Sequence, residues 1–255
     1  MKKRRARWAS TEQEIIEEVK KIRHSHPRMG ARKLLQKLAD FFKALGVKIG
    51  RDRFFALLKR HDLLILQRRK GRRTTFPGGL RSENLLETAE ISAVHQAYVT
   101  DITYMETEQG FVYLALVTDL YSRKIVGWDL SRSLSVDGAL RAIKRAVSQA
   151  KCDVKGLIHH SDHGIQYTSR PYLDYLSAHG IRSSMGRVGN CYDNAVAERV
   201  NGILKMEYLL DHRFPDFHLA HLAVKQAVDL YNTGRPHLSL NYQTPEEVYQ
   251  RSLAA

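Results

Sequence analysis

The sequence predicts a mixed α/β domain, with three antiparallel strands followed by two parallel ones, behind a small all-α domain. Two observations lead to this fold class. The spacing of hydrophobic residues changes from a helical period to a strand-like alternation after residue 91. The charge changes at the same place: residues 1–90 contain 24 Lys and Arg against 10 Asp and Glu, whereas residues 91–255 contain 17 of each. A segment with a large excess of positive charge in front of a neutral one indicates that the first segment binds a polyanion such as nucleic acid. The alternative is that these charges only form a solvated surface.

The first 66 residues are expected to form three short amphipathic helices. A capping box made by Thr11 and Glu14 marks the start of the first helix. The second helix is expected over residues 29–46, with the final glycine as its C-cap, and the third over residues 50–64. Three short helices with a basic last member are typical of helix-turn-helix-like DNA-binding domains, although other three-helix bundles share the pattern.

Two groups of basic residues in this front part are candidates for contact with DNA. The third helix presents a basic outward face, made of Arg51, Arg53, Lys59 and Arg60. Residues 67–90 are expected to be a basic linker, because they begin with a glycine-rich segment that has no apolar period. The linker's candidates are Arg68, Arg69, Lys70, Arg72 and Arg73. These side chains would follow a DNA backbone, or else the segment is a solvated tether.

The rest of the chain is expected to form the α/β domain, over residues 91–210, and a C-terminal helical extension of it, over residues 211–255. Alternation of apolar and polar residues predicts an antiparallel meander of three strands at residues 97–105, 111–119 and 123–131. Helix, strand, helix, strand and helix then follow at residues 135–150, 156–162, 170–180, 181–185 and 193–210.

Three acidic residues stand out in this domain. Asp101 lies in the middle of the first strand, where an unpaired carboxylate is costly to bury and therefore needs a cation or a metal as partner. Asp162 ends the fourth strand, at the carboxyl end where α/β sheets bind ligands. Glu198 lies on the helix that follows. The three carboxylates can converge on one point, and hard oxygen ligands without thiolates select Mg²⁺ or Mn²⁺.

The last helix also carries a polar stripe around Glu198, made of Asn194, Asn201 and Lys205, which we expect to contact DNA. A zinc site is the alternative to the magnesium site, because His159, His160 and His163 flank Asp162. Neighbouring histidines of a strand point to opposite faces, however, and the two cysteines lie far apart without a Cys-x-x-Cys pattern. We therefore expect His160 and His163 to orient Asp162 or to neutralise DNA phosphate.

Several segments together resemble one protein family. They read VTDITY, LVTDLYSRKIVGW, HSDHGIQYTS, GNCYDNAVAERVNGILKMEY and YNTGRPHLSLNYQTPEEVY. In this combination the chain resembles the transposases of bacterial insertion sequences of the IS-three (IS3) family, the catalytic subunit made from the second reading frame. Thirty-five residues separate Asp162 from Glu198, the spacing typical of that family's acidic triad. HPRMGARKLLQKL resembles the small helical domain in front of such cores, and Tyr98 departs from the family in a region that usually holds Trp.

The resemblance implies a ribonuclease-H-like core like that of retroviral integrases, with Asp101, Asp162 and Glu198 as catalytic acids that hold two Mg²⁺ or Mn²⁺ ions. It implies cleavage of a phosphodiester bond at the ends of an insertion sequence and transfer of the freed 3′-hydroxyl to DNA, by two-metal-ion in-line displacement. The implied partners are double-stranded DNA, both terminal inverted repeats and target, and further copies of the chain. An upstream helix-turn-helix protein, supplied separately or by frameshift fusion, is a further partner implied by the resemblance.

Three further expectations follow from the residues. Asp119 also lies in a Thr-Asp pair, but it falls where the second strand turns into the third, and turn chemistry explains it. A DNA-binding regulator or an inactive remnant that retains the fold is the alternative to an active transposase. No run of eighteen apolar residues occurs and the basic start lacks an apolar stretch behind it, which favours a cytoplasmic, nucleoid-associated protein without membrane spans.

Overall fold

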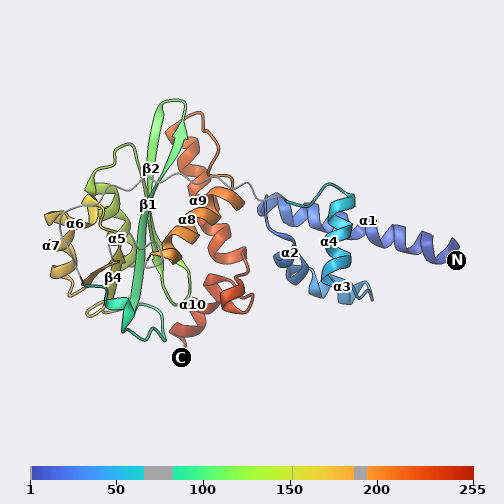
Figure 1. Cartoon of the computed structure of the whole chain (residues 1–255), viewed down its shortest axis with the longest axis horizontal. Coiled ribbons are helices and arrows are strands. Elements are labelled where there is room, and N and C mark those ends of the chain that lie inside the picture. The colour runs from blue at the N-terminus through green and yellow to red at the C-terminus, as the bar shows by residue number, and fades with distance from the viewer. Residues whose placement is uncertain (1, 66–82, 151, 187–193) are drawn as a thin grey trace.

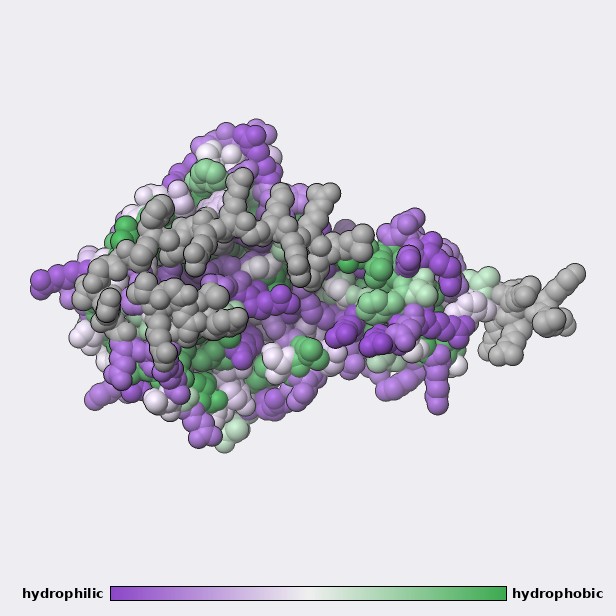
Figure 2. Space-filling view, in the orientation of Figure 1, coloured by the Kyte–Doolittle hydropathy of each residue, from purple (hydrophilic) through white to green (hydrophobic). Residues whose placement is uncertain are grey.

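The computed structural model describes residues 2–65, 83–150, 152–186 and 194–255. They form a helical domain beside a larger domain in which a sheet lies between two layers of helices (Figure 1). This arrangement confirms the predicted fold class. No helix in the described part of the chain is long and apolar enough to cross a membrane. Figure 2 shows hydrophilic side chains spread over both domains on the visible face.

The helical domain contains four helices: α1 (Lys2–Ser25), α2 (Ala31–Lys37), α3 (Ala39–Ala44) and α4 (Arg51–Arg60). They pack around a common apolar core that includes Ile15, Val19, Leu34, Phe54 and Leu57. The third predicted helix, α4, buries its apolar residues and exposes its basic ones, as the pattern predicts. The helical domain therefore has a core of its own.

Two details of these helices differ from the expectations. The capping box at Thr11 is wrong, because α1 already runs through it from Lys2, over basic residues and alanines that favour helix. The second predicted helix is broken at Leu38, a buried residue with φ −88° and ψ 3°, into α2 and α3. The glycine C-cap is confirmed: Gly46 has φ +64°, and the N–H of the next residue, Val47, donates to the carbonyl of Phe42.

The sheet of the larger domain has five strands in the order β3-β2-β1-β4-β5. Their bounds are β1 (Ala97–Thr107), β2 (Gly110–Asp119), β3 (Ile125–Ser131), β4 (Ile158–Ser161) and β5 (Arg182–Met185). The first three strands form an antiparallel meander, and β4 and β5 add to β1 in parallel. β1 is therefore the central strand, between β2 and β4.

Helices cover both faces of this sheet (Figure 1). On one face lie α5 (Val136–Ala150), α6 (Ile165–Thr168) and α7 (Arg170–Ala178), over one apolar core. On the other lie α8 (Ala195–Glu207) and α9 (Phe217–Gly234), over a second core. The C-terminal helix α10 (Pro245–Leu253) follows the short 3-10 turn η2 (Leu238–Leu240) and contacts α9.

The predicted linker over residues 67–90 is too long at its C-terminal end. Residues 66–82 lie outside the described part of the chain, and the 3-10 turn η1 (Leu85–Glu87) already packs on the sheet. The N–H of Leu85 donates to the hydroxyl of Ser184, and the N–H of Met185 donates to the carbonyl of Glu83. Residues 83–87 therefore follow the edge of β5.

The two domains meet at the C-terminal end of α8. The Glu207 carboxylate accepts from Lys33 Nζ of the helical domain at 2.6 Å and from the Arg235 guanidinium at 2.8 Å. Its carbonyl accepts from the N–H of Arg28 at 3.2 Å. Arg235 is only 2% exposed, so its positive charge pairs with Glu207 inside the protein and does not face solvent. The same helix, α8, carries Glu198 near its start, which places the domain contact and a candidate catalytic acid on one rigid element.

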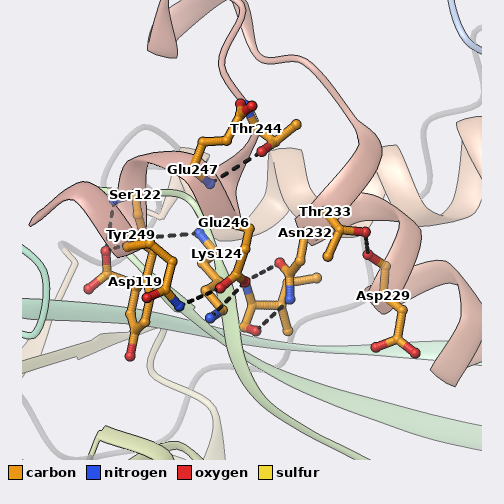
Figure 3. Close-up of polar contacts among 12 residues, drawn as sticks. Asp119, Ser122, Lys124, Asp229, Asn232, Thr233, Thr244, Glu246, Glu247 and Tyr249 are labelled. Carbon is orange, nitrogen blue, oxygen red and sulfur yellow. Dashed lines mark hydrogen bonds and ion pairs between the residues drawn. The ribbon is translucent and has the colours of Figure 1, made fainter. Parts of the chain in front are cut away.

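The connection between β2 and β3 is held by the C-terminal helices (Figure 3). Lys124 forms an ion pair of 2.8 Å with Glu246 of α10. The Asn232 amide of α9 accepts from the N–H of Ile125 at 2.9 Å and donates to its carbonyl at 3.0 Å. Asp119 is fully buried and accepts backbone and hydroxyl hydrogen bonds, as the turn interpretation of that residue predicts.

Candidate active site

The register of β1 and β4 places two of the three acids at the same level. Three residue pairs join the strands, ending with Val99 and His160. The same register, continued by two residues on each strand, sets Asp101 opposite Asp162, just beyond the end of β4 at Ser161. Both carboxyl groups therefore lie at the carboxyl end of β4, beside the central strand.

Asp101 points to the face of the sheet covered by α8. Its Oδ2 accepts a hydrogen bond of 2.7 Å from Asn201 Nδ2, and its Oδ1 accepts from the N–H of Ile102 at 2.9 Å. The predicted alternation holds, because Tyr98 and Ile102 pack in the core on the opposite face and Met105 packs beneath α8 and α9. Tyr98 itself is fully buried, so the aromatic residue at this position fills the core.

Asp162 is fixed by the residue two positions further on. The N–H of Gly164 donates to Asp162 Oδ1 at 3.0 Å. A Cβ atom at residue 164 would lie 2.9 Å from that oxygen, closer than real Cβ contacts. Glycine at this position thus lets the backbone approach the carboxylate. The pattern Ser-Asp-His-Gly in the sequence carries this signal.

Glu198 lies in the first turn of α8 and is exposed. Its N–H donates to the carbonyl of Asn194 at 3.1 Å, so the helix holds its backbone while the side chain extends into solvent. Partial burial raises the pKa of Glu198, and the negative charge of Asp162 adds to this. Of the three acids, Glu198 is thus the one with the most freedom to move.

The three carboxyl groups influence one another electrostatically. Burial raises the pKa of Asp101 to about 7, and the charges of Asp162 and Glu198 add to this, whereas the hydrogen bonds from Asn201 and Ile102 lower it. Burial also raises the pKa of Asp162 against the opposing effects of Gly164 and His163. A cation between the carboxylates would counteract both causes of the raised pKa values, because it replaces the hydration lost on burial and offsets the repulsion between the negative charges.

The donor set suits a hard divalent ion, but its members are not drawn together around one point. Within the described ranges, no group of three His, Cys, Asp or Glu side chains is close enough to hold a metal ion. Carboxylate oxygens alone, without a thiolate, are the ligands that Mg²⁺ and Mn²⁺ prefer.

The histidines near Asp162 do not form the alternative zinc site. His159 Nε2 bonds to the hydroxyl of Tyr172 on the α7 face, whereas His160 Nδ1 bonds to the hydroxyl of Ser184 at 2.9 Å. His163 Nε2 bonds to the carbonyl of Gly186. His160 is fully buried, so the expectation that it neutralises DNA phosphate is wrong for this structure. His163 is the histidine whose charge acts on Asp162.

The polar stripe of α8 faces the sheet, which corrects the assignment of two residues to DNA. Asn194 is 7% exposed and donates to the carbonyl of Thr100 at 3.0 Å, and Asn201 is 5% exposed and donates to Asp101. These amides face polar groups of β1 and hold α8 against that strand. Lys205 is half-buried with its Nζ 4.4 Å from the centre of the Tyr104 ring.

The four candidate DNA contacts on α4 are exposed, but three of them already contact other side chains of the helical domain. Arg60 donates to both carboxylate oxygens of Glu12 at 2.8 Å, and the Arg53 guanidinium lies 3.7 Å from the centre of the Trp8 ring. Arg51 bonds to its neighbour Asp52, and Lys59 is exposed. The linker candidates Arg68, Arg69, Lys70, Arg72 and Arg73 lie outside the described residues.

A cavity beside the acids was not foreseen from the sequence. Asp101 and Asp162 line it together with apolar and aromatic side chains of β1, β2, α6 and the segment between β3 and α5. These include Ile102, Tyr104, Tyr113, Leu134, Ile165 and Tyr167. The alternation of β1 indicates which side its residues take, but the cavity depends on where β4 ends, and the sequence pattern does not give that position.

Comparison with known proteins identifies the class to which this fold and site belong. Two integrase core domain families match the chain, at residues 92–191 and 179–245. One chain of a simian T-cell lymphotropic virus intasome aligns with a TM-score of 0.52 and 17% identity, over 87% of this chain and 70% of that one, and shows the same fold. The larger domain is an integrase-type catalytic core, a polynucleotidyl transferase.

The similar full-length sequences narrow this class to one family. The chain is 35% identical over 198 residues to a putative transposase for insertion sequence element IS986/IS6110 of Mycobacterium tuberculosis, covering 74% of this chain and 71% of that protein. It is 33% identical over 226 residues to transposase InsF for insertion sequence IS3A of Escherichia coli, covering 86% and 77%. The chain belongs to the IS3 family of insertion-sequence transposases, which confirms the resemblance seen in the sequence.

Proposed function

We propose that this transposase cleaves phosphodiester bonds at the ends of its insertion sequence and joins the freed 3′-hydroxyl to target DNA, with Asp101, Asp162 and Glu198 as the catalytic, metal-holding acids. One observation supports this most directly. The register that sets Asp101 opposite Asp162 brings the carboxylate of a β1 residue and that of the residue after β4 to one level, within electrostatic reach of Glu198.

Two divalent ions, Mg²⁺ or Mn²⁺, would activate the attacking oxygen and stabilise the leaving one in an in-line displacement. The chain's own residues prepare the site for them. Asn201 holds the Asp101 carboxylate and lowers its pKa, and the Gly164 N–H holds that of Asp162. Glu198, exposed on α8, is free to approach the other two acids. Lys205 supplies positive charge near Asp101, where a phosphate would lie.

The proposed substrates are the element's terminal inverted repeats and the target duplex. The helical domain would supply general affinity for DNA, because the first 90 residues carry the whole charge excess of the chain. We expect several copies to assemble on DNA, because two element ends must be processed together, and an upstream helix-turn-helix subunit to add specificity. Because the proposed substrate is bacterial DNA, we propose that the protein acts at the nucleoid in the cytoplasm.

A regulator that binds DNA without catalysis is the second candidate, and the two make opposite predictions for Glu198→Gln. If the chain is an active transposase, this variant folds and binds a labelled duplex carrying the element end as the wild type does, yet loses both cleavage and joining. The matched control is Glu106→Gln, which removes an exposed carboxylate near the far end of β1 and should retain activity. Cleavage by Glu198→Gln at more than a few per cent of the wild-type rate would contradict the assignment.

A further inference from the structure

The cavity beside the two strand acids results from the unequal lengths of β1 and β4. β4 pairs with β1 only through Ala97 to Val99, whereas β1 continues to Thr107. From Asp101 onwards, the β4 side of the central strand therefore borders a gap. Residues of α6 and the Leu134 segment lie across this gap, and the Gln166 amide donates to the carbonyl of Leu134 at 2.9 Å, which fixes them to each other.

Aromatic and aliphatic side chains make up much of the lining of this cavity, beside the two carboxylates and the polar residues Thr103 and Gln166. Tyr104 and Tyr113 are paired across β1 and β2 and both line it. Tyr167 is buried at its inner end. Two large apolar side chains on its lining face solvent: Ile165 is 65% exposed and Leu134 is 46% exposed. Exposed apolar side chains that gather around a concave site indicate a surface that a ligand covers.

The occupant must be compatible with the two acids that share the lining. A DNA strand whose phosphate lies at Asp101 and Asp162 carries its neighbouring bases within one nucleotide of the cavity. Bases are flat and largely apolar, and they stack on aromatic side chains whatever their sequence. The cavity volume of about 190 Å³ is below that of clefts for drug-sized ligands, so one ring system fits better than a whole nucleotide.

We propose that this cavity receives one unstacked nucleobase, next to the phosphate that is cleaved or attacked, between the tyrosines of the β1–β2 hairpin and the apolar side chains of Leu134 and Ile165. The inference rests on the proposed function, since it takes the DNA strand to lie at the carboxylates. Recognition is by stacking and apolar contact, so it discriminates little between the four bases. The base anchors the strand and thereby holds the phosphate against the acids.

The test compares Tyr113→Ala and wild type on two DNA substrates that differ in one base. One substrate is intact, and the other has an abasic site at the nucleotide next to the reacting phosphate. On intact DNA, Tyr113→Ala should lower the rate of cleavage or joining about tenfold, the effect of losing one base stack. On abasic DNA the wild type should be slowed to a similar extent, and Tyr113→Ala should slow it no further. An equal loss on both substrates would overturn the proposal.

The base in the cavity could belong to the element-end strand or to the target strand. Two series of abasic substrates distinguish these sources. One series carries the abasic site in the element-end strand and the other in the target strand. If the rate loss caused by Tyr113→Ala disappears on the abasic substrates of one series, the strand that carries the abasic site in that series supplies the base. If the loss persists in both series, the proposal is overturned. Ile165→Ala gives a second test that does not depend on the sheet, because the residue is exposed. It should show the same base-dependent loss, and Ile165→Trp should tighten binding of the intact strand.

The matched control is Phe111→Ala. Phe111 is an aromatic residue of the same hairpin, 54% exposed and in contact with the Tyr104 ring, but it does not line the cavity. For Phe111→Ala, the ratio of the rate on intact DNA to the rate on abasic DNA should equal that of the wild type. If wild type and this control cleave DNA in a metal-dependent way while Tyr113→Ala shows no coupling to the base, only the present inference fails. If the wild type does not cleave at all, the proposed function fails.

Discussion

Asn201 Nδ2 donates a hydrogen bond of 2.7 Å to Asp101 Oδ2, and this contact fastens the helix that carries Glu198 to the strand that carries Asp101. The other oxygen of Asp101 accepts from the N–H of Ile102. Both carboxylate oxygens are thus oriented by donors before any cation binds. The same amide also opposes the effect of burial, because its N–H favours the charged form of the acid.

We expect Asn201→Ala to shift the pH dependence of cleavage to higher pH. Loss of the donor removes a factor that lowers the pKa of Asp101, so more of this acid stays protonated near neutral pH and metal binding weakens. The rate should fall most below about pH 7 and recover in part as pH rises. Asn194→Ala is the control, because its amide bonds to a backbone carbonyl, and its profile should keep the wild-type position. Coincident profiles for Asn201→Ala and wild type would contradict the role of Asn201.

Asp101→Asn should stabilise the metal-free protein at alkaline pH while it abolishes metal binding. The folded-state pKa of Asp101 is raised to about 7, so the folded chain retains a proton that the unfolded chain releases near pH 4. Stability is therefore lost as pH rises from about 4 to 7, and the neutral amide avoids this loss. At pH 8 the variant should unfold with a free energy higher than that of the wild type by up to about 4 kcal/mol. Thermal unfolding at pH 5 and pH 8, with and without Mn²⁺, checks both effects.

Asp119→Asn should show the opposite pattern, with metal binding retained and stability reduced. Asp119 is fully buried and accepts from the N–H of His95, and from the N–H and hydroxyl of Ser122, at 2.6 to 2.9 Å. An amide cannot accept all three bonds with the same strength, so we expect a loss of about 1 to 3 kcal/mol. Urea unfolding and Mn²⁺ affinity measured beside those of Asp101→Asn separate the two acids. Loss of Mn²⁺ binding in a folded Asp119→Asn would reverse their assignment.

The sheet was predictable because β1, β2 and β3 alternate regularly, and alternation also indicates the face on which Asp101 lies. The interpretation of α8 was less successful for a physical reason. A polar stripe on a helix has the same pattern whether it faces water or polar groups of a strand, and Asn194 and Asn201 face the strand. Likewise the break at Leu38 falls within a continuous apolar stripe, so only the packing of the folded domain reveals it.

The contact between the two domains should depend on Glu207 far more than on an ordinary ion pair. Removing its carboxylate leaves Arg235, which is 2% exposed, without its charge partner inside the protein. Breaking a buried pair in this way costs about 3 to 5 kcal/mol. Glu246→Ala is the matched comparison, because Glu246 pairs with Lys124 in a more accessible position and should cost about 1 kcal/mol or less. Equal losses for Glu207→Ala and Glu246→Ala in urea unfolding would contradict the buried character of the contact.

The helical domain should bind DNA through Lys59 more than through Arg60, although both are exposed on α4. Arg60 already donates to both oxygens of Glu12 at 2.8 Å, whereas Lys59 has no ion pair in the described part of the chain. A cation that neutralises a DNA phosphate contributes about 0.9 to the slope of log affinity against log salt concentration. Lys59→Ala should therefore reduce that slope by about 0.9, and Arg60→Ala should reduce it by less.

Glu12→Gln provides the converse test of the same ion pair. The amide no longer neutralises the Arg60 guanidinium, so affinity for duplex DNA should rise and the salt slope should steepen by up to about 0.9. The pKa of Glu12 is lowered by its contacts with Arg60 and His61, so this gain should come with some loss of stability. Fluorescence anisotropy with a labelled duplex, between about 50 and 200 mM salt, measures all three variants. If Arg60→Ala reduces the slope as much as Lys59→Ala does, the pair with Glu12 opens when DNA binds, and the two residues serve the DNA equally.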